Sequence, residues 1–289
     1  MSDTAATTSE AARRQLERAA ARRRNDRRGF AIAATSTLLI LGGLAALVFT
    51  SPGWPDVQDS FFNPGDFAAV FPEILTAFWL DIKIFIVVEV AVLMLGLVVA
   101  LLRLTRGPAL FPVRLLATVY TDVFRGIPTI LLIYLVGFGI PALNPGADPD
   151  NFLISGVFLG SVALTLSYAA YVSEVYRAGV KSVERGQREA ALSVGLTSRQ
   201  ALRHVIVPQG VRRVGPPLLN DFIALQKDVA LLSIIGVFEA FRFAQVEAST
   251  NFVYTPLVAA AALYLLITIP MARLLDRYED GRAEGGRAR

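Results

Sequence analysis

The sequence predicts an all-α, polytopic membrane protein, and three observations support this fold class. Of the 289 residues, 54% are hydrophobic, which is high for a soluble domain. Several apolar runs reach the roughly 20 residues that cross a bilayer. Basic residues fall in every second segment between these runs, as the positive-inside rule requires of cytoplasmic loops. We therefore expect six transmembrane helices, at about 30–50, 74–103, 113–138, 152–178, 214–238 and 254–275.

The first of these helices follows an Arg-rich segment, 1–29, which we interpret as a basic cytoplasmic tail. Such a tail either lies as a helix on anionic lipid or stays solvated. A cleaved signal peptide is the alternative for 30–50. The leader before it is long, however, and Thr50-Ser51-Pro52-Gly53 is a poor cleavage site. These features favour a retained N-terminal helix.

The charges of the loops predict how the remaining helices are oriented. The segment 51–73 contains acidic residues and no Lys or Arg, so we expect an extracytoplasmic loop there. The long segment 177–213 is rich in Arg, and so is the C-terminal end, where we expect a tail at 276–289. The positive-inside rule places these two segments in the cytoplasm, together with both termini.

The composition also excludes several kinds of chemistry. The chain contains no Cys and a single His, His204, so thiolate chemistry and His-based metal or triad sites are not expected. No GxxxxGK[ST] phosphate loop occurs. We therefore expect no catalytic residues, no metal and no bound cofactor in this chain, which would not be an enzyme.

Between residues 182 and 210 the apolar spacing predicts two short amphipathic helices. Ala190 and Ala191 lie on the apolar stripe of the first helix, which Gly195 is placed to end in a left-handed conformation. Thr197 can then cap the second helix, with Gln200 as the return partner of a capping box. The result would be a compact helical knob around a glycine turn.

Pro208 is expected to close the second helix, because proline has no backbone N–H to donate. Spacing alone leaves open an ordinary amphipathic loop that lies on the membrane. A DNA-binding helix-turn-helix has the same turn spacing. The membrane spans on both sides argue against that alternative, and we expect no nucleic-acid partner.

The same segment resembles the signature cytoplasmic loop of permease subunits of bacterial ABC importers, with Glu189-Ala190-Ala191, Gly195 and Val205-Ile206-Val207-Pro208 at the motif positions. Further motifs in order resemble the polar amino acid permease family: Phe124-Arg125-Gly126-Ile127-Pro128, Ala170-Tyr171-Val172-Ser173-Glu174, Glu184-Arg185-Gly186-Gln187, Pro216-Pro217-Leu218-Leu219-Asn220-Asp221 and Leu225-Gln226-Lys227-Asp228. One departure is Val229-Ala230, where the family usually has Thr-Ser.

The resemblance covers about 74–275 and implies the five-helix core of a type I ABC importer permease domain, with 30–50 as an extra N-terminal helix. It implies a coupling loop at about 182–210 that contacts an ATPase through Glu189, Ala190, Ala191, Gly195, Val205 and Pro208. Implied partners are ABC ATPase subunits that use ATP and Mg, a second permease chain of the same or another kind, and an extracytoplasmic amino-acid-binding protein. A polar amino acid would be the substrate, and the lipid of the bacterial inner membrane would surround the spans.

Polar residues within the spans are candidates for the substrate pathway, because charges are costly there and usually face a protein interior or cavity. Lys227 lies roughly 20 Å beyond Arg213 along the helix, too deep to reach the cytoplasm. Either Lys227 and Asp228 line the pathway, or they form a neutralising network between helices. The full set of candidates is Glu89, Arg125, Tyr171, Asn220, Asp221, Lys227 and Asp228.

Three further expectations concern charged partners. Arg125 could bind a substrate carboxylate in a bidentate manner, or pair with Glu89, Asp221 or Asp228. Glu174, near the cytoplasmic end of its span, could pair with an Arg of the loop. Asp81 and Lys83 are expected at the outer membrane interface.

A different class of protein remains as the alternative function. A stand-alone secondary transporter or channel would use Lys227, Asp228 and Glu89 as ion or proton sites. Such a protein would work without an ATPase.

Overall fold

The computed structural model describes residues 29–30, 32–105, 107–143, 146 and 151–287, except for the side chains of Arg185 and of 278–287. Within these ranges the chain is helical and contains no β-strand, which confirms the all-α prediction. Two compact units are present, Met1–Asp59 and Ser60–Arg289. The expected basic tail lies outside the described residues except for Gly29.

The first unit contains the helix Ile32–Phe49, which is long and apolar enough to cross a membrane. Its aliphatic side chains are exposed, as expected of a helix surrounded by lipid. At its end Phe49 packs edge-on against Trp54, with 4.5 Å between the ring centroids. The predicted helix at 30–50 therefore has the length and composition of a membrane span.

The segment 51–73, which we expected as an extracytoplasmic loop, is largely helical. Helix α2 (Trp54–Phe62) occupies its first part, and α3 (Pro64–Leu104) begins ten residues before the predicted span. Asn63 explains the early start, since its Oδ1 accepts hydrogen bonds from the N–H groups of Gly65 (2.9 Å) and Asp66 (3.2 Å). Asn at the N-cap followed by proline is a helix start signal.

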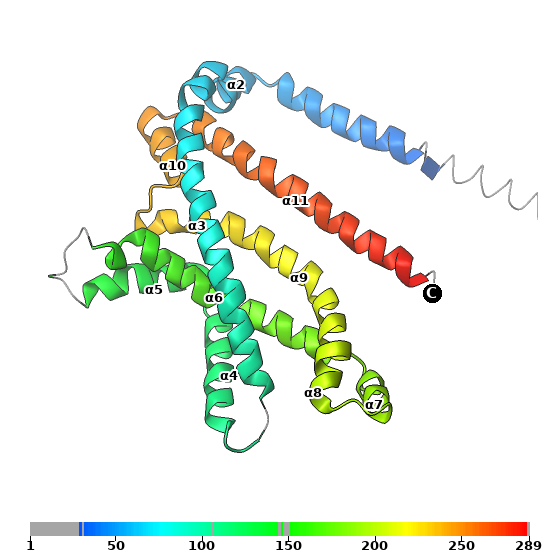
Figure 1. Cartoon of the computed structure of the whole chain (residues 1–289). Helices are drawn as coiled ribbons and strands as arrows, with labels where there is room; N and C mark the ends of the chain where they lie inside the picture. Colours follow the sequence, from blue (N-terminus) through cyan, green and yellow to red (C-terminus); the bar gives the residue numbers. More distant parts are fainter. Residues whose placement is uncertain (1–28, 31, 106, 144–145, 147–150, 288–289) are drawn as a thin grey trace, which may run out of the picture. The chain divides into compact units, whose positions relative to one another are not determined.

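Helix α3 packs along α6 (Gly156–Lys181), and these two helices form the centre of the second unit (Figure 1). They approach closely at Gly96, where an added Cβ would lie 2.7 Å from Cγ1 of Val172. The main core is aliphatic and includes Val88, Val92 and Leu164. A second cluster joins α3 to α10 (Ala240–Asn251) and α11 (Thr255–Arg287).

The predicted span 113–138 is two helices, which corrects the expectation of one. Helices α4 (Phe111–Gly126) and α5 (Thr129–Ala142) meet at an angle of 103°. The break lies at Ile127-Pro128, where Ile127 has the extended conformation that a following proline favours. The two helices form either one broken span or a re-entrant segment.

The predicted span 214–238 also differs. Helix α9 (Val207–Asp228) starts earlier, continues as the 3₁₀ segment η3 (Val229–Ile235), and stops at Gly236, whose φ is 86°. Helix α10 then occupies most of the predicted loop 239–253. The described residues contain four helices that meet the criteria for a span, or up to six if each bent pair is one span.

Candidate functional site

The knob between 182 and 206 has the predicted glycine turn. Helix α7 (Arg185–Ser193) ends at Gly195, which adopts a left-handed conformation with φ 87°. The N–H of Gly195 donates to Leu192 O at 3.0 Å, and the N–H of Leu196 donates to Ala191 O at 3.1 Å. This pair of hydrogen bonds is a Schellman motif, which fixes the end of the helix.

The second helix of the knob begins as the sequence predicts but does not end there. Thr197 and Gln200 form a complete capping box at the start of α8 (Ser198–Ala201). A π-helical turn (Leu202–Ile206, η2) then leads directly into α9. Pro208 does not close the helix, because it lies in the first turn of α9, where a missing N–H is tolerated.

The knob presents a small surface that is supported from behind. The side chains of Glu189 and Ala190 are exposed, whereas Ala191 and Ala201 are buried. Val205 is half-buried. A helix face that exposes alanine allows another protein surface to approach closely.

The base of the knob is a close crossing of α6 and α9. An added Cβ on Gly179 would lie 2.1 Å from Cγ1 of Val214 and 3.2 Å from Gly210 O. Arg213 adds a hydrogen bond from Nη1 to Ser182 O. The knob is therefore held at α6 by a close backbone approach and is joined to α9 by continuous helix.

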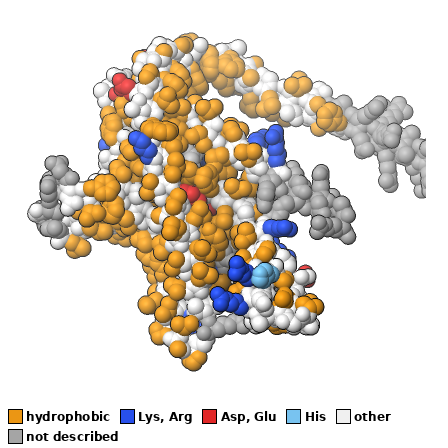
Figure 2. Space-filling view, viewed as in Figure 1, with side chains coloured by type: hydrophobic (Ala, Val, Ile, Leu, Met, Phe, Trp, Pro, Cys, Tyr) orange, Lys and Arg blue, Asp and Glu red, His pale blue; other side chains and the backbone are white. Residues whose placement is uncertain are grey.

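Basic side chains are exposed beside the knob. Figure 2 shows several of them next to His204, at the end of the molecule where α8 lies in Figure 1. Arg199 and Arg203 are exposed here, and so is Arg212 on the first turns of α9. This surface suits an acidic or polar partner surface.

Glu174 on α6 forms ion pairs with three Arg side chains. Glu174 pairs with Arg103 at the end of α3. It also pairs at 2.5 Å with Arg177, the residue at which the predicted cytoplasmic loop begins. Arg125 lies 3.6 Å from the same carboxylate. Its guanidinium also lies over the ring of Tyr171, 5.5 Å from the centroid, and the Tyr171 hydroxyl donates to Arg125 O at 3.2 Å.

The structure shows which charged partner Arg125 has. It pairs with Glu174 and with none of Glu89, Asp221 or Asp228. Arg125 and Glu174 line a cavity of about 380 Å³ together with Gly179, Ser182 and Arg213. We call it the polar cavity, and it adjoins the base of the knob through Gly179, Ser182 and Arg213.

The remaining pathway candidates divide into buried and exposed groups. Glu89 on α3 lies within electrostatic range of Asp221 on α9. Asp221 Oδ2 is buried and has no hydrogen-bond partner among the described residues. Asp228 accepts a hydrogen bond from the hydroxyl of Tyr168 at 2.8 Å.

Lys227 and Asn220 lie on the exposed side of α9. The neutralising network expected for Lys227 and Asp228 is not formed, because Lys227 makes no ion pair within the described part of the chain. If α9 and α10 cross the membrane as one bent pair, the exposed Lys and Asn need a polar environment outside this subunit.

The sequence reasoning missed a buried cluster around Tyr264. Its hydroxyl contacts Asp81 Oδ2 at 2.7 Å and Glu239 Oε2 at 3.4 Å. Asp81 is buried inside the protein, whereas Lys83, which we expected beside it at the outer interface, is exposed. Glu239 accepts hydrogen bonds from the N–H groups of Phe241 and Arg242, both at 2.7 Å, and so caps α10.

Comparison with known proteins decides the family. Residues 93–283 match the model of the family described as "Binding-protein-dependent transport system inner membrane component". The chain belongs to this family. The match includes the knob, the polar cavity and both broken helix pairs.

Two bacterial relatives are similar over most of their length. The probable amino-acid permease protein YxeN of Bacillus subtilis is 34% identical over 73% of this chain and 92% of its own length. The arginine transport system permease protein ArtQ of the same organism is 33% identical, over 71% of this chain and 91% of its own.

Solved structures agree with these relatives. An amino acid ABC transporter, crystallised with histidines, contains a chain that is 30% identical and superposes with a TM-score of 0.66 over 74% of this chain and 95% of its own. A chain of the inward-facing MetNI methionine ABC transporter shares the fold, with a TM-score of 0.53 at 20% identity, over 71% of this chain and 95% of its own.

The resemblance to ABC importer permeases of the polar amino acid type is therefore confirmed. The chain is a permease subunit of an ABC importer and a multi-pass protein of the inner membrane. The assignment accounts for the exposed polar residues on α9, since permeases of this kind work as parts of larger assemblies.

Proposed function

We propose that this subunit forms one half of the translocation pathway of an ATP-driven importer of polar amino acids. A second permease chain forms the other half, and an extracytoplasmic binding protein delivers the substrate. The names of the relatives support this substrate class, since they include amino-acid, arginine and glutamine permeases. The termini and the knob face the cytoplasm, in agreement with the Arg-rich loops.

The observation that carries the mechanical part of the proposal is the double capping of the knob. The Schellman motif at Gly195 and the capping box at Thr197 fix both helices that meet at the turn. We propose that Glu189, Ala190, Ala191 and Gly195 sit in a groove of an ABC ATPase subunit. The ATPase binds ATP and Mg and closes, and the knob transmits this movement to α6 and α9 as a rigid-body rotation.

The helix is continuous from Ser198 to Asp228, so a movement of the knob is transmitted along it toward the membrane. The same helix carries Asn220, Asp221, Lys227 and Asp228, so a rotation at the knob changes the position of the proposed pathway residues. Val205 and Pro208 lie at the junction between the knob and α9. Alternating access then follows from two discrete packings of one subunit against the other.

We also propose which side chains contact the substrate. Arg125 is held by Glu174 and Tyr171 with its guanidinium partly exposed, so it can still reach a substrate carboxylate. Lys227 and Asn220 face outward from the subunit, toward the place of the second permease chain. Glu89, Asp221 and Asp228 supply acceptors for a substrate amino group.

The test uses the complete importer, reconstituted in liposomes with its ATPase and binding protein. Gly195→Pro removes the N–H that bonds Leu192 O, and proline cannot adopt a φ near 87°. Glu189→Arg reverses the charge of an exposed side chain. We expect both variants to insert in the membrane but to lose at least tenfold in substrate-stimulated ATP hydrolysis and in uptake.

Asp276→Arg is the matched control, because it makes the same charge change on an exposed residue of α11, outside the knob. It should retain ATPase binding and uptake. Wild-type ATPase binding and uptake in both knob variants would overturn the coupling role.

A further inference from the structure

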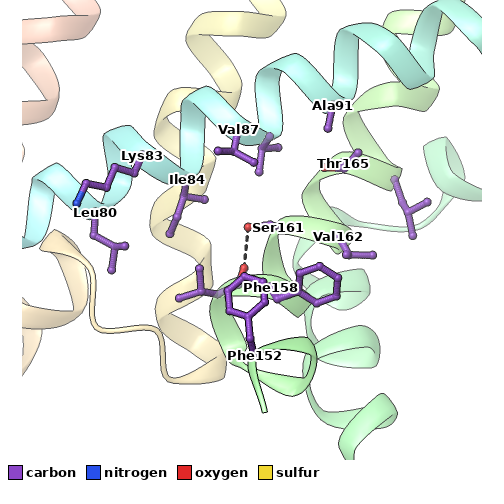
Figure 3. Close-up of a pocket in the computed structure, with 13 residues that line it drawn as sticks. Leu80, Lys83, Ile84, Val87, Ala91, Phe152, Phe158, Ser161, Val162 and Thr165 are labelled. Carbon is purple, nitrogen blue, oxygen red and sulfur yellow. Dashed lines mark hydrogen bonds between the residues drawn. The ribbon is translucent and has the colours of Figure 1, made fainter. Parts of the chain in front are cut away.

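A groove unrelated to the polar cavity lies between α3 and α6. It has a volume of about 430 Å³ and an apolar lining. Ile84, Val87 and Ala91 line it from α3, and Phe158 and Val162 line it from α6 (Figure 3). Phe152, from the short 3₁₀ helix Phe152–Ile154 before α6, covers the end at which α6 begins.

The walls of this groove suit hydrocarbon and not a polar substrate. The hydroxyl of Ser161, one of its few polar groups, donates to Val157 O at 2.6 Å within its own helix. The dashed line in Figure 3 marks this hydrogen bond. A hydroxyl that is satisfied in this way offers no donor to a bound amino acid.

One charged residue, Lys83, lines the groove. Its side chain extends along α3 toward Leu80, so the ammonium group lies at the end of the groove nearest the N-terminus of α3 (Figure 3). Lys83 is exposed and makes no ion pair or hydrogen bond within the described part of the chain.

The position of Lys83 along α3 sets its depth in the membrane. Arg103 follows 20 residues later in the same helix, which is about 30 Å at 1.5 Å per residue. This distance equals the hydrocarbon thickness of a bilayer, about 30 Å. With Arg103 at one surface, the ammonium of Lys83 lies at the other, at the level of the lipid phosphates.

We propose that the groove is a binding site for an anionic phospholipid. The phosphate is held by Lys83, and one acyl chain lies along Ile84, Val87 and Ala91, directed toward the bilayer centre. This occupant satisfies both features of the groove, since it neutralises an unpaired cation at one end and supplies hydrocarbon along the rest. A purely apolar occupant would leave the cation without a partner.

Native mass spectrometry of the purified importer complex tests the charge component. Phosphatidylglycerol and phosphatidylcholine with identical acyl chains are the two probes. We expect the wild type to retain phosphatidylglycerol preferentially. Lys83→Gln should weaken its retention about fivefold, the effect of one basic residue near a lipid surface. Lys83→Arg should preserve the preference, and so should Lys181→Gln, which removes an exposed charge outside the groove.

A second pair of variants tests the acyl-chain component. Ala91→Phe fills the groove and should reduce retention of both lipids. Ala262→Phe adds the same ring at an exposed position on α11 and should leave retention unchanged. Equal retention of the two lipids by the wild type, or unchanged retention in Lys83→Gln or Ala91→Phe, would overturn the proposal.

The sequence contains no Cys, so a single introduced thiol reports on a protein occupant. Val87→Cys on two copies of the chain should not form a disulfide in membranes if lipid fills the groove. Efficient disulfide formation would show that a second permease chain covers it and would overturn the lipid assignment.

Discussion

At the scale of single residues, several polar groups of the spans have their hydrogen-bond partners on other helices, as Asp228, Asp81 and Gln226 do. Asp81 lies 183 residues from its partner Tyr264 in sequence. The cost of a charge within a span made residues such as Glu89 and Asp221 candidates for the pathway, because that cost depends on residue type and depth alone. Their partners were not predictable, since residue type does not say which helices become neighbours.

Tyr264 supplies a single hydroxyl proton to two buried carboxylates. Tyr264→Phe leaves Asp81 Oδ2 without this donor, and Oδ1 already has no partner among the described residues. We expect a loss of about 1–3 kcal/mol in the free energy of unfolding, measured as a lower thermal midpoint of the purified chain. Tyr254→Phe is the control, because Tyr254 is half exposed and stacks on Phe61 through its ring. Equal shifts in the two variants would contradict the prediction.

At the scale of elements, the sequence predicted the helix caps of the knob correctly but did not predict where longer helices break or continue. Gly195, Thr197 and Gln200 were predicted with their roles, because caps are local hydrogen-bond patterns. Pro128 lies inside the predicted span 113–138, but the angle of 103° between α4 and α5 depends on what each helix packs against. The expectation that Pro208 ends the second helix was wrong, because the helix continues from the preceding π-helical turn into α9.

The crossing of α6 and α9 gives a prediction at this scale. Gly179→Ala places a methyl group 2.1 Å from Val214 Cγ1, so we expect destabilisation of about 1–3 kcal/mol from overpacking. Thermal unfolding of the purified chain measures it. Adding Val214→Ala should restore part of the loss.

Gly186→Ala is the control for that change. Gly186 lies in α7 with no atom near its would-be Cβ, and alanine is the better helix former. This variant should be neutral or more stable. A comparable loss in Gly179→Ala and Gly186→Ala would argue against a close helix crossing.

At the scale of the whole molecule, the subunit is incomplete by itself. Lys227 and Asn220 are exposed within a span, and the knob exposes Glu189 and Ala190. Our proposal assigns a partner to each surface, the second permease chain to the first and an ABC ATPase subunit to the second. This is the arrangement of a subunit and not of a stand-alone transporter.

We therefore expect no amino acid uptake by liposomes that contain this chain alone, whether driven by a proton or a sodium gradient. Uptake should appear only when the ATPase, the binding protein and ATP are added. The radiolabelled amino acid retained in the vesicles is the measurement. Ion-driven uptake by the chain alone would favour the secondary-transporter alternative, with Lys227, Asp228 and Glu89 as its ion sites.

The all-α membrane fold, the family and the caps of the knob could all be predicted from the sequence. These properties depend on hydrophobic run length, motif order and local hydrogen bonding, which can all be read from the order of residues in the chain. Three features became visible only in the folded chain: Arg125 pairs with Glu174, Asp81 is buried against Tyr264, and α3 and α6 leave an apolar groove beside Lys83. These features arise from contacts between helices distant in sequence, and no local pattern specifies how such helices pack.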